Sequence, residues 1–140
     1  MPHPPFRVAH ISALPRFTNP DGTELEYDFR MVRRPLGVRA FGVNAMQAEE
    51  AGRVVVPEHS ELAEGQRHEE LYYVARGAAR FTVDGEPVEA PEGTFVFVPD
   101  PASTRSAVAT RPGTVVLGIG GEPGAAFTPS AWEAAWSGQE

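Results

Sequence analysis

Short apolar runs separated by glycine, proline and other turn residues recur along the whole chain, a pattern typical of strands joined by turns. The 14 glycines and 14 prolines are spread over all 140 residues. Nowhere do about 18 apolar residues run together, so no membrane-spanning helix is expected. The predicted strands cover residues 6–11, 27–33, 39–44, 52–57, 70–74, 79–83, 87–90, 94–98 and 114–121.

Two of the connections contain residues that favour tight turns. Asp84 and Gly85 stand between two extended runs, and both central residues of a type I′ turn need positive φ, so a tight hairpin is predicted there. Residues 79–83 then fold back along residues 87–90. A second turn is predicted at residues 35–37, which read Pro-Leu-Gly.

The run TFVFVP has an alternating pattern that sends its side chains to opposite faces of a strand. Phe95 and Phe97 share one face, and Val96 and Val98 share the other. Because both sets are apolar, we expect both faces to be covered, as in a barrel or a sandwich. Glycines in residues 114–121 indicate bends or a close approach of neighbouring backbone.

A short helix is predicted near the carboxyl end. Thr128 precedes a proline, and Ser130 with Glu133 forms the S-x-x-E pattern of a capping box. Trp132 and Trp136 lie four residues apart and therefore on one helical face. We expect these tryptophans to dock the helix on the sheets or on a partner subunit.

Composition narrows the class of protein. With 41% hydrophobic and 22% charged residues, the chain is expected to fold as a soluble globular protein. A net charge of -7 opposes binding to nucleic acid or anionic membranes. The absence of cysteine excludes disulfides, thiolate metal sites and a cysteine nucleophile. Proline and charge interrupt residues 1–17 where a signal peptide needs an apolar core, so a cytoplasmic location is expected.

Sequence motifs for several enzyme classes are also missing. The chain has no G-x-S-x-G elbow, no phosphate-binding loop and no dinucleotide fingerprint. Serine hydrolase and Rossmann-type activities therefore have no support, and no nucleotide cofactor is expected.

Two spaced motifs carry a resemblance to a known family. Glu70 is followed by six residues and Gly77, while Gly93 is followed by five residues and Pro99, with the predicted hairpin between the two motifs. Residues 52–121 thereby resemble the cupin superfamily, in particular small single-domain cupins of undefined function. In that family the two motifs sit on a small antiparallel barrel and commonly supply three histidines and a glutamate to one metal ion.

The resemblance implies an all-β fold. We expect a cupin-type antiparallel β-barrel, also described as a double-stranded β-helix or jelly roll, with an amino-terminal strand arm and a short carboxy-terminal helix. The expected organisation is one cupin domain over residues 1–140, with an arm at 1–47, a core at 48–121 and a terminal segment at 122–140. Cupins often form homodimers, and the arm could supply an exchanged strand.

The customary ligand positions of the family fit this sequence incompletely. In the second motif Pro101 replaces a glycine, and Thr104 falls where a histidine is expected. In the first motif the positions of the paired histidines fall on Ala63 with Gly65 or on Glu64 with Gln66.

If residues 62–66 are an inserted loop, residues 59–61 align with the paired histidines of the first motif. The alignment then puts His59 and Glu61 on one strand face, and His68 and Glu70 on one face of the next strand. These four residues are the candidate metal ligands. Glu70 is expected to point inward, where a buried carboxylate needs a cation or hydrogen-bond donors.

Two imidazoles with one or two carboxylates suit Fe(II), Mn(II), Ni(II) or Zn(II). A substrate that chelates at open positions of such an ion could be oxidised, isomerised or deprotonated. Simpler interpretations stay open. His68 lies in the charged run RHEE, which is also typical of a solvated loop, and Glu61 belongs to a run of spaced glutamates typical of an acidic surface.

Candidate substrate-binding residues are mostly aromatic, and the set is Tyr72, Phe81, Phe95, Phe97 and Arg105. Aromatic side chains suit a planar or apolar ligand in a barrel mouth, although they also fill the core of a small barrel. Arg105 could bind an anionic substrate group or could be an exposed turn residue. His3 and His10 are interpreted as structural or solvent-exposed.

Three functions are compatible with these features. The leading hypothesis is a small-molecule enzyme that uses a divalent transition metal, with oxygenase, isomerase or cyclase-like activity. The alternative is a non-catalytic ligand-binding or sensor barrel without a metal, which the missing histidine of the second motif favours. A structural or accessory subunit is the third. The expected partners are a small-molecule ligand and a second copy of the chain.

Overall fold

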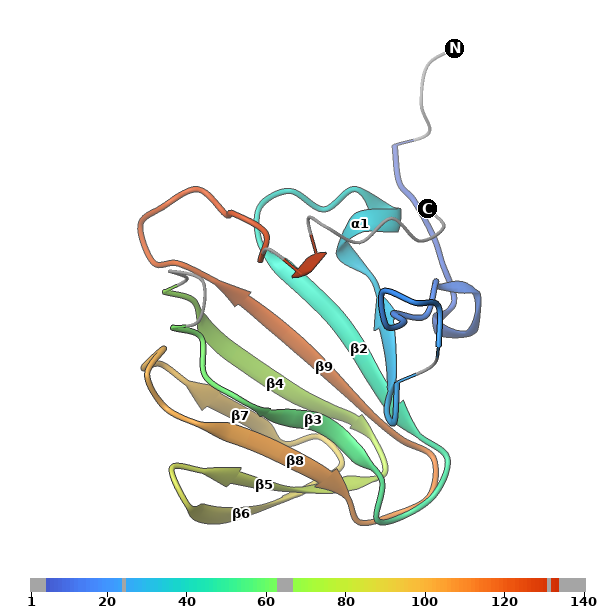
Figure 1. Cartoon of the computed structure of the whole chain (residues 1–140), viewed down its shortest axis with the longest axis vertical. Helices are drawn as coiled ribbons and strands as arrows, with labels where there is room; N and C mark the ends of the chain where they lie inside the picture. Colours follow the sequence, from blue (N-terminus) through green and yellow to red (C-terminus); the bar gives the residue numbers. More distant parts are fainter. Residues whose placement is uncertain (1–4, 24, 63–66, 131, 134–140) are drawn as a thin grey trace.

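The computed structural model describes residues 5–23, 25–62, 67–130 and 132–133 (Figure 1). Almost all regular structure in these residues is β-strand. The strands are β1 (Asp28–Met31), β2 (Gly42–Ala48), β3 (Val54–His59), β4 (Glu69–Arg76), β5 (Ala78–Val83), β6 (Glu86–Pro91), β7 (Phe95–Val98), β8 (Arg105–Ala109) and β9 (Thr114–Gly121). A 3-10 turn, η1 (Ile11–Ala13), and a one-turn helix, α1 (Arg33–Leu36), lie in the amino-terminal part.

The strands form two antiparallel sheets that face each other (Figure 1). One sheet has the order β1-β2-β9-β4-β7, and the other has the order β3-β8-β5-β6. The expected all-β antiparallel architecture is therefore confirmed. Neighbours in each sheet include strands far apart in sequence, such as β2 with β9 and β3 with β8, so pairing joins distant segments.

The predicted hairpin is confirmed. Asp84 and Gly85 have φ values of 48° and 82°, as a type I′ turn requires. They connect β5 to β6, and the register pairs Ala79 with Ala90. The turn is held from outside as well, because the backbone N–H of Thr104 donates to the Asp84 carboxylate.

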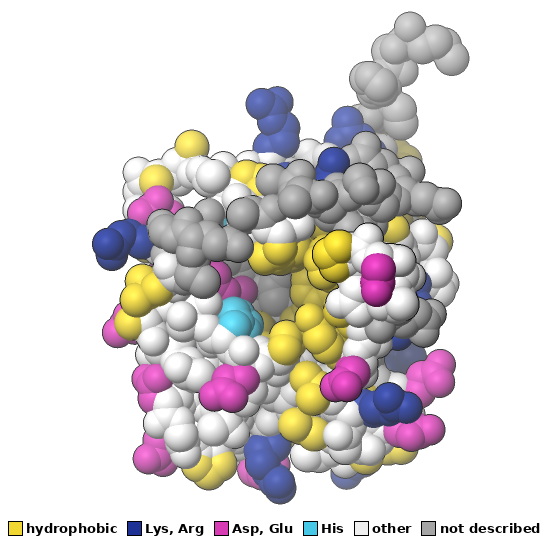
Figure 2. Space-filling view, viewed as in Figure 1, with side chains coloured by type: hydrophobic (Ala, Val, Ile, Leu, Met, Phe, Trp, Pro, Cys, Tyr) yellow, Lys and Arg dark blue, Asp and Glu magenta, His cyan; other side chains and the backbone are white. Residues whose placement is uncertain are grey.

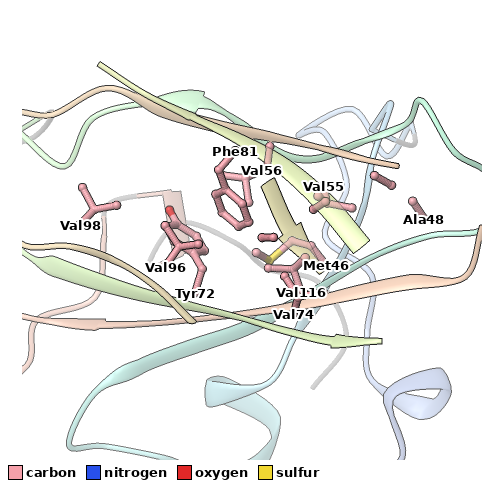
Figure 3. Close-up of a cluster of buried hydrophobic side chains, with 14 residues drawn as sticks. Met46, Ala48, Val55, Val56, Tyr72, Val74, Phe81, Val96, Val98 and Val116 are labelled. Atoms are coloured by element: carbon pink, nitrogen blue, oxygen red, sulfur yellow. The ribbon is translucent and has the colours of Figure 1, made fainter. Parts of the chain in front are cut away.

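The hydrophobic core fills the space between the sheets (Figure 3). β4 contributes Tyr72 and Val74, which are 1% and 0% exposed, and β5 contributes Phe81 from the opposite sheet. The rings of Tyr72 and Phe81 lie 5.4 Å apart. Full burial of one such side chain stabilises the folded state by about 1.5–3 kcal/mol. Glu70 belongs to the same inward-facing row of β4, as the alternation predicts.

The placement of three aromatic residues corrects the sequence analysis. Phe95 and Phe97 alternate with Val96 and Val98 as predicted, but they are 63% and 54% exposed on the outer side of β7. Their side chains point away from the core, and Phe97 borders an open hollow of the outer surface together with Leu71 and Ile119. Phe81 is fully buried and belongs to the core instead of a ligand-binding surface.

Segments near the amino end also differ from the predictions. Residues 6–10 are not a strand, and the exposed ring of His10 accepts a hydrogen bond from the Ser12 backbone N–H at the start of η1. The second predicted strand ends at Met31, because the chain turns into α1. Gly37 ends that helix with a φ of 75°, a conformation that glycine adopts at little cost.

The predicted carboxy-terminal helix is not shown. Of its residues the structure describes 128–130 and 132–133, while Trp136 lies outside the described residues, as does His3 near the other end. Glu133, expected to complete a capping box, binds Arg33 through a 2.6 Å hydrogen bond. In the described part of the chain, no helix has the length and apolar character needed to cross a membrane.

Candidate functional site

A cavity of about 410 Å³ opens beside the core and is lined by residues of both sheets and of the carboxy-terminal segment. Figure 2 shows a hollow bordered by hydrophobic side chains, with a histidine at its edge. Its lining contains an aromatic group (Phe17, Tyr27, Phe29, Trp132) and a polar group (His59, Glu61, Glu70, Tyr72), together with Asn44, Met46, His68, Gly118 and Phe127. The two groups define what a bound molecule would contact.

His59 is the last residue of β3 and lies opposite Arg105 of β8. β3 is an edge strand, which tolerates Pro57, and a register shift between Val56 and His59 redirects the chain there. The His59 Nδ1–H donates to the Pro57 carbonyl at 2.7 Å, and Nε2 lies 3.1 Å from Glu61 Oε1. A ring that donates from both nitrogens is an imidazolium.

The charge state of His59 follows from these contacts. Burial alone would lower its pKa, but the hydrogen bonds to the Glu61 and Glu70 carboxylates outweigh burial and raise the pKa to about 10. Glu61 lies just beyond β3, where its backbone N–H donates to the Pro101 carbonyl. The expected shared strand face is therefore replaced by a turn that still brings the two side chains together.

Glu70 points between the sheets from β4. Its Oε1 accepts hydrogen bonds from the Tyr72 hydroxyl and from Arg105 Nη1, the latter at 2.8 Å, and lies 3.6 Å from His59 Nε2. Burial would raise the pKa of Glu70, but these donors outweigh burial and lower it. Burial, together with the adjacent Glu70 carboxylate, raises the pKa of Tyr72 well above its ordinary value. Gly120 of β9 pairs with Glu70 and leaves room for its side chain, since a Cβ added at position 120 would lie only 3.2 Å from Glu70 Cγ.

Arg105 completes the arrangement from the interior. Its side chain is fully buried, and Nη1 lies 3.6 Å from Glu61 Oε1 as well as 2.8 Å from Glu70 Oε1. Nε and Nη2 donate to the backbone carbonyls of Ser103 and Asp100. We call His59, Glu61, Glu70 and Arg105 the charge cluster; its two cations balance its two carboxylates.

His68 does not join the charge cluster, although the sequence placed it on one strand face with Glu70. It precedes β4, so the alternation of that strand does not govern it. Its ring is stacked on Phe127 with centroids 5.3 Å apart, and it is 7% exposed. The Arg33 guanidinium lies 5.4 Å from the same Phe127 ring. His68 therefore lines the cavity as part of the packing around the carboxy-terminal segment.

The aromatic group was missed by the sequence analysis. Phe17, Phe29 and Trp132 meet edge to face, with ring centroids 5.2–5.9 Å apart. Tyr27 adds a fourth ring, 6.4 Å from Phe29. Alternation of Tyr27 and Phe29 within a predicted strand was the available signal, but nothing local showed that residues 17 and 132 would meet them.

The donor set fits a metal ion only in its spacing. Ligand atoms of His59, Glu61 and Glu70 all lie within 4.8 Å of one another, so one ion could contact all three. Their present partners do not fit this role, because Glu70 Oε1 already accepts from Arg105 and His59 holds a proton that a metal would have to displace. Thr104, where the family carries a histidine, supplies its backbone N–H to Asp84.

No protein-family model and no curated protein sequence matches the chain. Solved structures do match it. A cupin protein from Bacteroides fragilis has a TM-score of 0.63 at 16% identity, covering 99% of this chain and 100% of that one. A predicted oxalate decarboxylase from Thermotoga maritima has a TM-score of 0.57 at 18% identity, covering 81% of this chain and 97% of that one.

A third similar structure is Pac13 from Streptomyces with uridine. It has a TM-score of 0.57 at 18% identity and covers 87% of this chain and 82% of that one. Another structure of Pac13 is described as that of a nucleoside dehydratase. Identities this low carry information on the fold and not on the reaction. The chain therefore has the fold of these cupin structures.

Proposed function

We propose that this chain binds a small, uncharged organic molecule with a planar ring, and that it does so without a metal ion. The observation that carries the proposal is the balanced charge cluster beside a group of aromatic rings. Two cations and two carboxylates already neutralise one another in the polar part of the cavity. A charged ligand would bring an uncompensated charge into a partly buried site, which is costly.

The aromatic group favours a flat apolar part in the ligand. Aromatic rings that line a cavity can pack against a further ring in an edge-to-face or offset-stacked arrangement. The cavity volume of about 410 Å³ lies within the usual range of small-molecule sites. In the polar part, the Glu61 carboxylate can accept a hydrogen bond from a ligand hydroxyl, and the side chain of Asn44 also faces the cavity.

A nucleoside has these properties, since it combines a planar base with neutral hydroxyl groups. Pac13, one of the proteins of similar fold, was determined with uridine. Uridine is therefore a reasonable first probe for this chain, alongside simpler aromatic alcohols. The proposal concerns the class of neutral, hydroxylated ring compounds and does not depend on uridine itself.

Titration calorimetry with matched neutral and anionic probes tests the proposal. Uridine and benzyl alcohol should bind more tightly than uridine monophosphate and benzoate. Glu61→Gln should reverse the preference, because it removes one negative charge and leaves the cluster with a net positive charge. Arg80→Gln, at an exposed position outside the cavity, is the matched control and should change nothing. A wild-type preference for the anions would refute the proposal.

The metal-dependent enzyme is the second candidate function. The observation that favours it is the spacing of the His59, Glu61 and Glu70 donor atoms. This function would use Fe, Mn, Ni or Zn for an oxygenase, isomerase or cyclase-like reaction, and it requires rearrangement of the Arg105 contacts. Elemental analysis of protein purified without an affinity tag tests it, because stoichiometric metal would favour the enzyme and its absence the binding protein.

The remaining expectations stay predictions from the sequence. They are a homodimer, a cytoplasmic location and the lack of nucleic-acid and membrane partners. Size-exclusion chromatography with light scattering would test the homodimer directly.

A further inference from the structure

Arg105 is the largest fully buried side chain among the described residues. A guanidinium does not lose its proton in a protein, so burial leaves a permanent positive charge in the interior. Such a charge is tolerated only when hydrogen bonds and a counter-charge surround it. The hydrogen-bond acceptors and carboxylates around Arg105 therefore indicate the role of its charge.

The surroundings of Arg105 hold its guanidinium in one orientation. The residue begins β8, between His59 of β3 and Val83 of β5. Nε donates to the Ser103 carbonyl at 3.2 Å, and Nη2 donates to the Asp100 carbonyl at 3.3 Å. Both carbonyls belong to the segment that precedes β8. With these two nitrogens held by backbone, Nη1 remains for the carboxylates.

Nη1 meets the carboxylates from two different parts of the fold. It lies 2.8 Å from Oε1 of Glu70 on β4, in the opposite sheet, and 3.6 Å from Oε1 of Glu61, which follows β3. Glu61 and Glu70 are also two of the three residues whose donor atoms could contact one ion. The guanidinium and a metal ion would thus compete for the same two carboxylates.

We infer that Arg105 takes the electrostatic place of a divalent metal ion in this site and excludes such ions from it. The inference rests on the metal-free part of the proposed function and gives its physical cause, but it does not depend on which organic molecule binds. Two physical reasons support it. The Glu70 oxygen that faces the site is engaged by Arg105, and a fixed cation in contact with both carboxylates repels a second cation. A fully buried side chain, held at its other nitrogens, has no solvent position to which it could withdraw.

Metal binding by wild-type protein and two Arg105 variants tests the inference. Tag-free protein is dialysed to equilibrium against Ni²⁺, Zn²⁺ or Mn²⁺, each as the metal alone, and bound metal is measured by mass spectrometry. Arg105→His removes the fixed cation and adds an imidazole, so it should bind one equivalent about tenfold or more tightly than wild type. Arg105→Lys keeps the positive charge and should resemble wild type. The gain in Arg105→His should disappear when His59→Ala is added.

Two results would overturn the inference. One is a wild-type protein that binds an equivalent of any of these ions and loses it in Glu70→Gln. The other is an Arg105→His variant that keeps the wild-type circular dichroism spectrum but gains no affinity. If Arg105→His does not fold, thermal unfolding of wild type with excess metal decides the question. An unchanged midpoint supports the inference, and a rise that vanishes in His59→Ala refutes it. Neither readout involves the organic ligand, so failure of this inference is distinguishable from failure of the proposed ligand binding, which the calorimetry with neutral and anionic probes tests separately.

Discussion

The ion pair between Glu70 and Arg105 connects the two sheets, and a double-mutant cycle can measure its contribution to stability. Arg105 is fully buried and Glu70 is 20% exposed at its side chain, with 2.8 Å between Nη1 and Oε1. The cycle compares Glu70→Gln, Arg105→Met and the double variant with wild type. Each replacement keeps the approximate length of the side chain, so changes in packing stay small.

The expected magnitude follows from what each variant leaves behind. Removing one partner of a buried ion pair typically costs 3–5 kcal/mol. Arg105→Met leaves Glu70 with donors from Tyr72 and His59, which places its cost near the lower end, about 3 kcal/mol. Glu70→Gln keeps an acceptor for Arg105 and should cost about 2 kcal/mol.

The double variant removes both charges of the pair, so neither side chain is left buried without its counter-charge. It should cost about 3 kcal/mol, which gives a coupling energy of about 2 kcal/mol between the two positions. Urea unfolding followed by circular dichroism measures these differences without the ionic screening of guanidinium salts. The pair Arg80 and Glu89 is the matched control: its atoms are only 2.5 Å apart, but both side chains are more than half exposed.

The control pair should show a coupling energy below about 1 kcal/mol, because solvent screens it. Single-variant costs of Glu70→Gln and Arg105→Met that add to the cost of the double variant within about 0.5 kcal/mol would refute the reasoning. In that case the two side chains would not act as a unit, whatever their distance.

Three further predictions concern the cavity, the hairpin and the histidine. Gly118→Ala should weaken ligand binding while keeping the stability of the fold, because its Cβ would make ordinary contacts 3.4–3.6 Å from the cavity residues Met46 and Tyr72; calorimetry and thermal unfolding measure the two effects. Gly85→Val should destabilise the protein by about 1 kcal/mol or more in urea unfolding, since position 85 has a φ of 82°. The ring resonances of His59 should stay constant from pH 6 to 8, because its pKa is raised to about 10; NMR measures them.

Controls separate these effects from general damage. Gly121→Ala lies on the same strand in open space and should leave ligand binding unchanged, whereas equal weakening by both alanines would contradict the assignment of the cavity wall. Gly85→Asn, which tolerates positive φ, should cost less than Gly85→Val. Because the folded-state pKa of His59 exceeds 6.5, its stabilisation is complete below pH 6.5 and is lost as the pH rises through 10. A ring that titrates near pH 6.5 would show that its hydrogen bonds to the carboxylates are absent.

Features that depend on neighbouring residues were predictable from the sequence alone. The hairpin at Asp84 and Gly85 followed from the φ values that its turn type requires, and the structure has them. The alternation in β7 was also predictable, because successive side chains of a strand point to opposite faces. Glu70 was expected to face inward and to need a partner, and it meets Arg105 and Tyr72.

Alternation did not reveal which face would be covered. Phe95 and Phe97 are as apolar as the valines between them, so the residues themselves do not identify the inner face. β7 forms the edge of the five-stranded sheet, and the opposite sheet covers only its valine side. Coverage is a property of sheet packing, which involves segments remote in sequence.

The candidate site shows the same division. By itself the sequence determined an all-β fold of the cupin type and singled out His59, Glu61 and Glu70, which the structure brings together. Only the tertiary structure turned His68 towards Phe127 and placed Arg105 between the carboxylates. The physical reason is the distance in sequence over which each feature is decided. Turn conformation and alternation depend on adjacent residues. The partners of a buried charge depend on the pairing of β3 with β8 and on the packing of the two sheets against each other.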